Sequence, residues 1–280
     1  MTRRKLDFGV TLKNICDFNN SSIEFIFCDI DDTLTLDGKL PANSYHAIWN
    51  LYNKGFKIIP VTGRPAGWCE MIARFWPVEG VIGENGAFYF KYESHSKRMV
   101  RYFDLNNQDQ DKNSKILAKV NLRVKNEIPK AKVSSDQFAR MFDLAIDFCE
   151  DVTPPLSKDE INHIVKIFEE EGAQAKVSSI HVNGWVGNFD KVKTCKLFCK
   201  NELKLEFSSI QDKIIFIGDS PNDEPMFKEF KNSVAVSNIK KFLNLLNHPP
   251  AFVTKNEGGD GFVEFSNHII SLNSATETKD

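Results

Sequence analysis

The sequence predicts an α/β protein in which a parallel sheet is flanked by helices and a second, α+β domain is inserted into the first. Three observations support this fold class. Short apolar runs alternate with segments of helical pattern in both halves of the chain, polar turn residues follow several of these runs directly, and the alternation stops between residues 91 and 185. Such alternation is typical of a parallel sheet covered on both faces, which binds ligands beyond the carboxyl ends of its strands.

The expected strands are the apolar runs, because strands that are buried on both faces read as continuous instead of alternating. They cover residues 25–28, 56–61, 81–82, 214–217, 234–236 and 251–254. Start and stop signals predict helices between them. These helices cover residues 44–53, 65–75 and 191–203.

The middle of the chain is predicted to be the inserted domain. Its expected elements are a helix over 109–128, an apolar segment over 138–148, a helix over 157–171 and a strand over 175–186. Because strand and helix units resume afterwards, residues 1–90 and 186–280 are assigned to the core and residues 91–185 to the insertion. The polar tail, 271–280, is expected to fray.

Composition excludes several classes of partner. The chain has 36 basic and 38 acidic residues and a formal net charge of −2, so no long-range positive field would attract nucleic acid or an acidic membrane. No apolar run approaches the ~20 residues that cross a bilayer, and no apolar stretch follows the basic start as in a signal peptide. We therefore expect a cytoplasmic protein that binds neither nucleic acid nor membrane.

The six cysteines are scattered and several lie in apolar segments, which favours reduced, buried thiols. Cys195 and Cys199 are one helical turn apart and could share a metal ion. No second Cys or His pair stands nearby to complete a zinc site, so zinc is not expected.

Acidic residues directly follow two of the predicted strands. Asp29, Asp31 and Asp32 come after 25–28, while Asp219 and Asp223 come after 214–217. A single such cluster is usually an acidic turn or a helix cap. Two clusters at the ends of strands in one parallel sheet converge, however, and together they predict an oxygen-rich site for a hard cation such as Mg²⁺.

A third predicted strand ends in Thr62-Gly63-Arg64-Pro65. This turn brings a hydroxyl group and free backbone N–H groups to the start of the next helix, where an anion can bind. Alone it would read as an ordinary helix cap. Together with the acidic clusters it supplies the donors that a metal-bound phosphoryl group needs.

These segments resemble the ordered motifs of the haloacid dehalogenase superfamily. A further element, 84–87, is similar to one that follows the third strand in its type IIB branch. That branch includes Cof-like, sucrose-phosphate, trehalose-phosphate and mannosyl-phosphoglycerate phosphatases, and also phosphomannomutase. The matching segments are 29–35, Thr62, Lys191, 218–223, 84–87 and the glycine-rich 258–261.

The resemblance implies a Rossmann-like core with an inserted C2-type cap, and it implies roles for the matching positions. Asp29 would attack phosphorus and form an aspartyl-phosphate. Asp31 would first protonate the leaving oxygen and then activate the water that cleaves the intermediate. Thr62 would donate a hydrogen bond to a phosphoryl oxygen.

Lys191 would neutralise the charge that builds up between nucleophile and phosphoryl group. The Asp-Lys-Gly that is familiar in this branch is here Asp190-Lys191-Val192, and Lys193 and Lys196 stand nearby on the same predicted helix. Each of these lysines could instead lie on a solvated face of the helix without a role in the site. The sequence therefore leaves open which of the three serves the active site.

By the same resemblance, the metal ligands are the side chains of Asp29 and Asp219, the backbone carbonyl of Asp31, and Asp223 directly or through water. The metal is expected to be Mg²⁺. Asp32 stands where many relatives have a glycine, and it is not expected to be a ligand.

Four further residues are candidates for substrate binding: Thr33, Arg64, Asn85 and Asn222. Thr33 is also placed to help position Asp31, and the asparagines have the alternative of satisfying turn backbone. In the cap, Arg140, His181 and Asn183 are candidates to contact the leaving group, with a structural role as the simpler reading of each.

The predicted function is a Mg²⁺-dependent phosphatase, a phosphoric monoester hydrolase that acts on a small phosphorylated metabolite such as a sugar phosphate. A cap that closes over the site suits a small substrate. A phosphosugar mutase resembling phosphomannomutase is the first alternative, and a non-enzymatic scaffold is the second. The sequence does not distinguish a monomer from a homodimer.

Overall fold

The structure, a computed structural model, describes residues 12–104, 107–178 and 180–277. The chain forms two compact units. One consists of residues up to 56 together with those from 211 onward, and the other consists of residues 57–210. Each unit is described by itself. The predicted boundaries of the insertion, at 91 and 185, are a different division and stay a prediction.

The first unit is built on a parallel sheet whose strands follow the order β1, β13, β12, β11, β2. Their bounds are Lys13–Asn14 (β1), Phe25–Cys28 (β2), Ile214–Gly218 (β11), Ser233–Ala235 (β12) and Phe252–Val253 (β13). Every residue of β2 and β11 is buried, which explains why both read as continuous apolar runs. The predicted strands of this sheet are confirmed, whereas the short and polar β1 has no apolar run to signal it.

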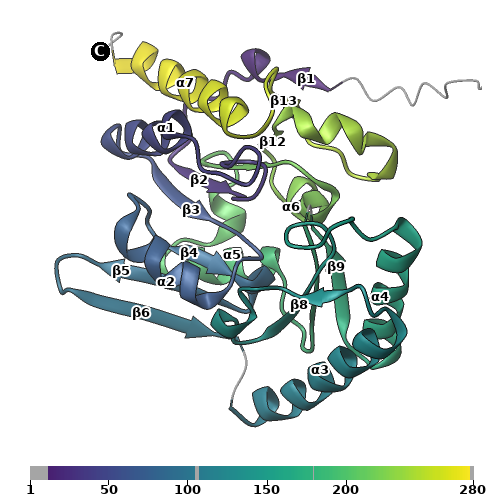
Figure 1. Ribbon diagram of the computed structural model, residues 1–280. Coiled ribbons are helices and arrows are strands. Elements are labelled where there is room, and N and C mark those ends of the chain that lie inside the picture. The colour runs from purple at the N-terminus through teal and green to yellow at the C-terminus, as the bar shows by residue number, and fades with distance from the viewer. Residues whose placement is uncertain (1–11, 105–106, 179, 278–280) are drawn as a thin grey trace, which may run out of the picture. The chain divides into compact units, whose positions relative to one another are not determined.

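The helices of the first unit are α1 (Ala42–Asn53), α6 (Glu224–Glu229) and α7 (Gly258–Glu277). Figure 1 shows α1 and α7 side by side, and the Ser266 hydroxyl on α7 donates a hydrogen bond to the Ala47 carbonyl on α1. The expectation of a frayed tail was wrong for residues 271–277, because they continue α7. Residues 278–280 lie outside the described residues.

The second unit begins with β3 (Lys57–Pro60), α2 (Ala66–Phe75) and β4 (Val81–Gly83). A parallel bridge joins Val61 to Ile82. β4 then pairs antiparallel with β5 (Phe88–Glu93), which pairs antiparallel with β6 (Arg98–Phe103). Antiparallel strands were not predicted here, and they include residues that were assigned to the insertion. Near its end the unit contains α5 (Lys191–Phe198), which continues to Leu203 as a π-helix.

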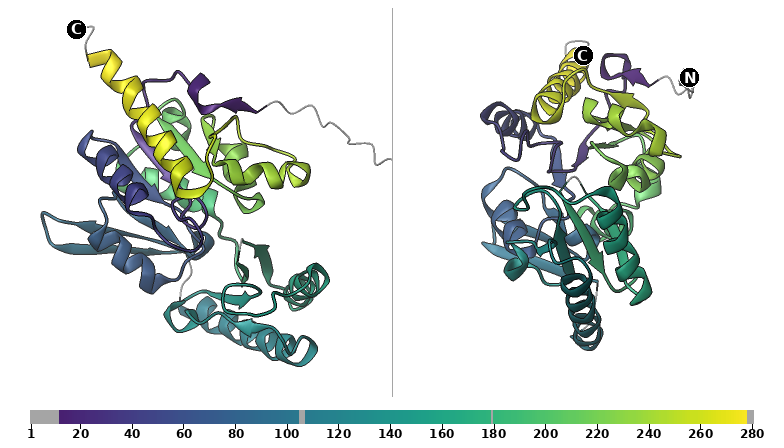
Figure 2. Two further views of the ribbon diagram at one scale, coloured as in Figure 1. Left: turned by 45° about the horizontal axis from the view of Figure 1, so that its top comes forward. Right: turned by 45° about the vertical axis from the view of Figure 1, so that its right-hand side comes forward.

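A second sheet lies in the region predicted to be the cap. Its antiparallel strands follow the order β7, β8, β10, β9, with bounds Lys132–Val133, Asp143–Asp147, His181–Trp185 and Gln174–Val177. Helices α3 (Asn107–Glu127) and α4 (Lys158–Glu170) cover one face of this sheet (Figure 2). Both helices are close to their predicted bounds. The single strand predicted over 175–186 is a hairpin, β9 and β10.

The cap helices are held by an apolar core and by a specific helix start. Val124 of α3, Ile146 of β8 and Phe168 of α4 belong to one buried cluster. Ser157 caps α4 by accepting a hydrogen bond from the Glu160 backbone N–H while the Glu160 carboxylate accepts one from Ser157. This reciprocal capping explains why the helix begins at Lys158.

All six cysteines are free thiols. Cys28, Cys69, Cys195 and Cys199 are buried, as expected, and burial raises the pKa of Cys199 to about 12. Cys16 is exposed. Each helix of the described residues is too short or too polar to cross a bilayer.

Candidate active site

Three buried aspartates converge in the first unit. β2 and β11 are parallel, with Ile217 opposite Cys28, so Asp29 and Asp219 follow at the same edge of the sheet. Asp223 reaches this edge from the turn after β11, and oxygens of the three carboxylates lie within 4.8 Å of one another. Carboxylates this close and this well buried repel one another unless a cation is near. The set therefore suits a hard divalent cation.

The geometry of the acidic turn is fixed by local contacts. The Asp219 backbone N–H donates a hydrogen bond of 3.1 Å to Asp223 Oδ2. A side chain at Gly218 would overlap the Asp223 carboxylate, so only glycine fits there. The Thr33 hydroxyl, which was expected to help position Asp31, lies 3.5 Å from Asp219 Oδ1 and so contacts a predicted metal ligand.

The loop after Asp29 turns around one carbonyl group. The Ile30 carbonyl accepts hydrogen bonds from the N–H groups of Leu34 and Thr35. Asp32 has a φ of +56°, a left-handed conformation that favours glycine, and its N–H donates to Thr35 Oγ1 at 2.7 Å. Glycine would adopt this conformation without strain, whereas an aspartate is strained there.

In the second unit, Thr62 is buried at the end of the first strand. Its hydroxyl oxygen accepts a hydrogen bond of 3.0 Å from the Arg64 N–H, so its own proton can be donated elsewhere. The Ala66 N–H, at the start of α2, donates to Glu84 Oε1 at 3.0 Å. The expectation of free N–H groups at this turn was therefore wrong for Arg64 and Ala66, since a side chain of the protein itself already uses each of them.

The structure distinguishes the three lysines of the α5 region. Lys191 is buried in the first turn of α5, behind the capping residue Asp190. Lys193 is half-exposed and contacts Asp104 at 2.9 Å, and Lys196 is exposed. Burial thus favours Lys191 as the lysine of the site.

Asn85 and Gly86 lie between the Thr62 turn and the start of α5. The Asn85 N–H donates to the Thr62 carbonyl at 3.1 Å, and the Thr194 hydroxyl on α5 donates to the Gly86 carbonyl at 2.5 Å. Gly86 has a φ of +104°, and a side chain there would overlap the Asp190 carbonyl. The segment around Asn85 therefore has a tightly defined position.

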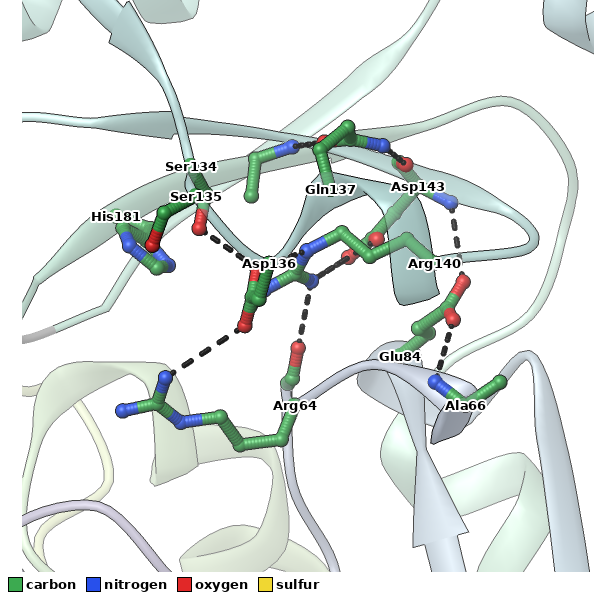
Figure 3. A network of polar contacts seen from close by, with 12 residues as sticks. Arg64, Ala66, Glu84, Ser134, Ser135, Asp136, Gln137, Arg140, Asp143 and His181 are labelled. Atoms are coloured by element: carbon green, nitrogen blue, oxygen red, sulfur yellow. Dashed lines mark hydrogen bonds and ion pairs between the residues drawn. The ribbon is translucent and has the colours of Figure 1, made fainter. Parts of the chain in front are cut away.

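A network of charged groups surrounds Arg140 (Figure 3). Its guanidinium group contacts Asp136 and Asp143, each at 3.0 Å, and donates a hydrogen bond of 2.9 Å to the Gly63 carbonyl. The Arg64 side chain lies 3.6 Å from the same Asp136. The turn after Thr62 is thus fixed to residues 136–143 through both arginines.

Glu84 makes the second connection to this segment. Its carboxylate accepts hydrogen bonds from the N–H groups of Met141, Phe142 and Asp143, the shortest being 2.6 Å from Phe142. Burial and the negative charge of Asp143 raise the pKa of Glu84 to about 8, against the effect of the backbone hydrogen bonds. Burial also raises the pKa of Asp143, while Arg140 opposes this shift.

Glu150 completes the network. Its carboxylate lies 3.0 Å from His181 Nε2 and 3.2 Å from Arg64 Nη2. The hydrogen bond with His181 and the charge of Arg64 lower the pKa of Glu150 to about 2. Arg140 and His181 were two of the candidates to contact the leaving group. Both are held by carboxylates of the protein, which favours a structural role for each of them.

The predicted site residues divide between the units. The first unit holds the half-buried Asp31 and Asn222 and the buried Asp29, Thr33, Asp219 and Asp223. The second unit holds Thr62, Arg64, Asn85 and Lys191, all of them buried. Sequence reasoning missed Asp136, Asp143 and Glu150, because no local motif marks them.

Comparison with protein families assigns the chain. Residues 26–138 and 188–265, more than half of the sequence, match the haloacid dehalogenase-like hydrolases. The chain belongs to this family. The resemblance inferred from the motifs is thereby confirmed. The matched residues of this haloacid dehalogenase-like hydrolase include Asp29, Thr62, Lys191 and Asp219.

Two relatives of this haloacid dehalogenase-like hydrolase in sequence are named phosphoglycolate phosphatases. Phosphoglycolate phosphatase of Methanobrevibacter smithii is 28% identical to this chain, and the alignment covers 87% of this chain and 97% of that protein. The structure of Thermoplasma acidophilum 0175 is similar with a TM-score of 0.66 and 19% identity, covering 89% of this chain and 99% of that one. The sucrose-phosphatase of Synechocystis, solved with sucrose and phosphate, has a TM-score of 0.60 and 15% identity over 89% and 98% of the two chains. The predicted fold class and the enzyme class, a phosphoric monoester hydrolase, are confirmed.

Proposed function

We propose that the protein is a Mg²⁺-dependent phosphatase that hydrolyses the phosphate monoester of a small metabolite, a sugar phosphate, through an aspartyl-phosphate. The observation that carries this proposal is the trio Asp29, Asp219 and Asp223, whose carboxylate oxygens lie within 4.8 Å of one another at the ends of β2 and β11. Buried carboxylates in this number need a cation, and oxygen ligands are those that Mg²⁺ prefers.

In this proposal Asp29 is the nucleophile. A carboxylate oxygen of Asp29 forms a bond to phosphorus as the bond between phosphorus and the leaving oxygen breaks, and Asp31 gives that oxygen its proton. Asp31, now a carboxylate, then takes a proton from a water molecule. The water oxygen bonds to phosphorus, the bond to Asp29 breaks, and inorganic phosphate is released.

The residues present fit a divalent cation. Asp29, Asp219 and Asp223 offer three carboxylates, and the predicted fourth ligand is the backbone carbonyl of Asp31. When bound, Mg²⁺ would neutralise the negative charge shared by the nucleophile and the phosphoryl oxygens, which otherwise repel each other.

Thr62 and Lys191 are proposed to stabilise the phosphoryl group. The Thr62 hydroxyl accepts its hydrogen bond from Arg64, so its proton can be donated to a phosphoryl oxygen. Lys191 is the buried lysine of the three. A buried cation is worth more to a transition state than an exposed one, because water screens it less.

One other substrate and one other reaction are the alternatives. The similarity to phosphoglycolate phosphatase makes phosphoglycolate a candidate. A mutase that returns the phosphoryl group to a sugar uses the same pair of aspartates, and it remains the alternative reaction. The proposed partner is a small phosphorylated metabolite, bound by a monomer or a homodimer.

Release of inorganic phosphate from a panel of phosphorylated metabolites tests the proposal. The panel should contain hexose, pentose and triose phosphates, phosphoglycolate and p-nitrophenyl phosphate, each with Mg²⁺ and after chelation. Phosphate release that requires Mg²⁺ is expected. Interconversion of hexose 1- and 6-phosphates with an activating bisphosphate, without net phosphate release, would instead identify a mutase.

A further inference from the structure

Two buried amide side chains in the second unit have unused hydrogen-bonding capacity. Asn85 and Asn183 are each only 3% exposed. Neither amide atom of Asn85 has a hydrogen-bond partner within residues 57–104, 107–178 and 180–210, and the same holds for Asn183 Oδ1. Buried polar groups are nearly always paired, so two such side chains in one place require an explanation.

Both amides face the same point on the Thr62 turn. A methyl group placed on Gly63 would lie 3.0 Å from Asn183 Nδ2 and 3.2 Å from Asn85 Oδ1. Asn85 also lies next to Thr62, because the Asn85 N–H donates a hydrogen bond to the Thr62 carbonyl. The two amides are therefore beside the residue proposed to bind the phosphoryl group.

The strand β10 directs Asn183 away from the cap core. Val182 is part of the apolar core, and Gly184 is packed against Phe168 of α4. Asn183 alternates with these residues and so points to the opposite face of the sheet. Trp185 shares that face, and its buried Nε1–H has no partner among the described residues either.

Such an arrangement costs folding free energy unless something binds there. We infer that Asn85 and Asn183 are specificity-determining residues that hydrogen-bond the leaving group of the substrate. The inference rests on the proposed function, since it assumes that a phosphate ester is bound at Thr62. It adds the residues that select the leaving group.

The charges around the amides select a neutral leaving group. Arg64 and Arg140 each contact two carboxylates, so neither is available to pair with a substrate carboxylate. The three carboxylates of Asp136, Asp143 and Glu150 outnumber the two arginines that they contact. An additional anion would be repelled, whereas a hydroxyl group can both donate to and accept from an amide.

Lys176 is a cation near Asn183 that could bind a carboxylate of the substrate. Lys176 of β9 is opposite Asn183 in the sheet register and is exposed. A carboxylate-bearing leaving group would have to recruit this lysine. If the leaving group is neutral and carries hydroxyl groups, as a polyol or a sugar does, Lys176 should not contribute to its binding.

Matched pairs of substrates test the inference with the full-length protein and Mg²⁺. Glycerol 3-phosphate and 3-phosphoglycerate differ only in a hydroxymethyl group against a carboxylate, and sorbitol 6-phosphate and 6-phosphogluconate form the corresponding longer pair. We expect kcat/KM to favour the hydroxyl member by tenfold or more in at least one pair. A preference for the carboxylate member, or no preference in either pair, overturns the inference.

Variants separate the roles of the amides. Asn183→Leu should reduce the preference for the hydroxyl member by roughly tenfold, the effect of one lost hydrogen bond between neutral groups. Asn85→Gly, which tolerates the φ of +56° at that position, should do the same. Lys176→Ala, and Asn162→Ala on the exposed side of α4, should leave the ratio unchanged.

Three readouts distinguish the inference from its alternatives. A merely structural Asn183 would lower Tm when replaced, whereas a ligand-binding one whose Oδ1 has no internal partner should leave Tm unchanged or higher in Asn183→Leu. A larger preference for the hydroxyl member in Lys176→Ala would show that Lys176 binds the carboxylate of the other member, and it would contradict the inference. Failure to hydrolyse even p-nitrophenyl phosphate would contradict the proposed function instead.

Discussion

The Glu84 carboxylate accepts a hydrogen bond of 2.6 Å from the backbone N–H of Phe142, which is 58 residues further along the chain. The same carboxylate accepts from Ala66 at the start of α2. One buried side chain thereby joins the Thr62 turn to the segment that carries Arg140. Within the second unit, the predicted phosphate-binding turn and this part of the cap are held together by internal contacts.

The first prediction concerns the pH dependence of stability. The pKa of Glu84 is raised from 4.5 to about 8 in the folded protein. Between these values the folded chain keeps a proton that the unfolded chain has lost, so the stabilisation is complete below the lower value and is lost as pH rises to the upper one. Glu84→Gln has no proton to lose, and its free energy of unfolding should change less across this window.

Urea unfolding in steps across the same pH window measures this effect. The comparison uses the slope of the free energy of unfolding against pH, because Glu84→Gln also changes the hydrogen bonds and will shift the absolute values. Parallel slopes for Glu84→Gln and the unmodified protein would show that Glu84 does not titrate in this range.

The second prediction concerns Arg140. Arg140→Ala leaves Asp143 buried without its cation, and removing one partner of a buried pair typically costs ~3–5 kcal/mol. Arg98→Ala is the control, because the Arg98 side chain is 70% exposed and pairs with Glu93 at 3.4 Å. An exposed pair is worth less than ~1 kcal/mol. Equal losses in denaturant unfolding would contradict the importance assigned to the network.

The third prediction separates the lysines. Lys191→Ala should lower kcat by about 10²–10³-fold, the usual effect of removing a group that stabilises transition-state charge. Lys196→Ala should leave kcat unchanged, because Lys196 is exposed. Steady-state kinetics with p-nitrophenyl phosphate compares the two variants, and the reverse order would assign the role to Lys196.

The fourth prediction concerns the metal. Chelation should abolish activity, and Mg²⁺ should restore it. Ca²⁺ should inhibit, because a larger ion that takes more ligands disturbs the in-line geometry at Asp29. Undiminished turnover after exhaustive chelation would exclude the proposed role of Asp29, Asp219 and Asp223 as metal ligands.

Much of the fold could be predicted because its signals are local. The apolar runs correctly placed β2 and β11, and the helix predicted over 157–171 corresponds to α4. The acidic residues after β2 and β11 could be brought together from topology alone, because parallel neighbouring strands end at the same edge. Oxygens of Asp29 and Asp219 do meet there.

The charged network could not be predicted, because its contacts join residues far apart in sequence. Arg140 donates to the Gly63 carbonyl 77 residues away, and Glu84 occupies the N–H group of Ala66 that was expected to be free. β5 and β6 were also missed. Each carries strand-forming aromatic residues, but residues 91–103 were assigned to the insertion once the strand and helix alternation had stopped.

The most direct test of the central claim is to look for phosphate on Asp29. Asp31→Asn should block hydrolysis of the intermediate, so this variant, mixed with Mg²⁺ and p-nitrophenyl phosphate and quenched with acid, should carry one phosphoryl group on the peptide that contains Asp29. Asp29→Asn in the same experiment should carry none and should release no phosphate. A phosphoryl group on another residue, or full activity of Asp29→Asn, would contradict the account.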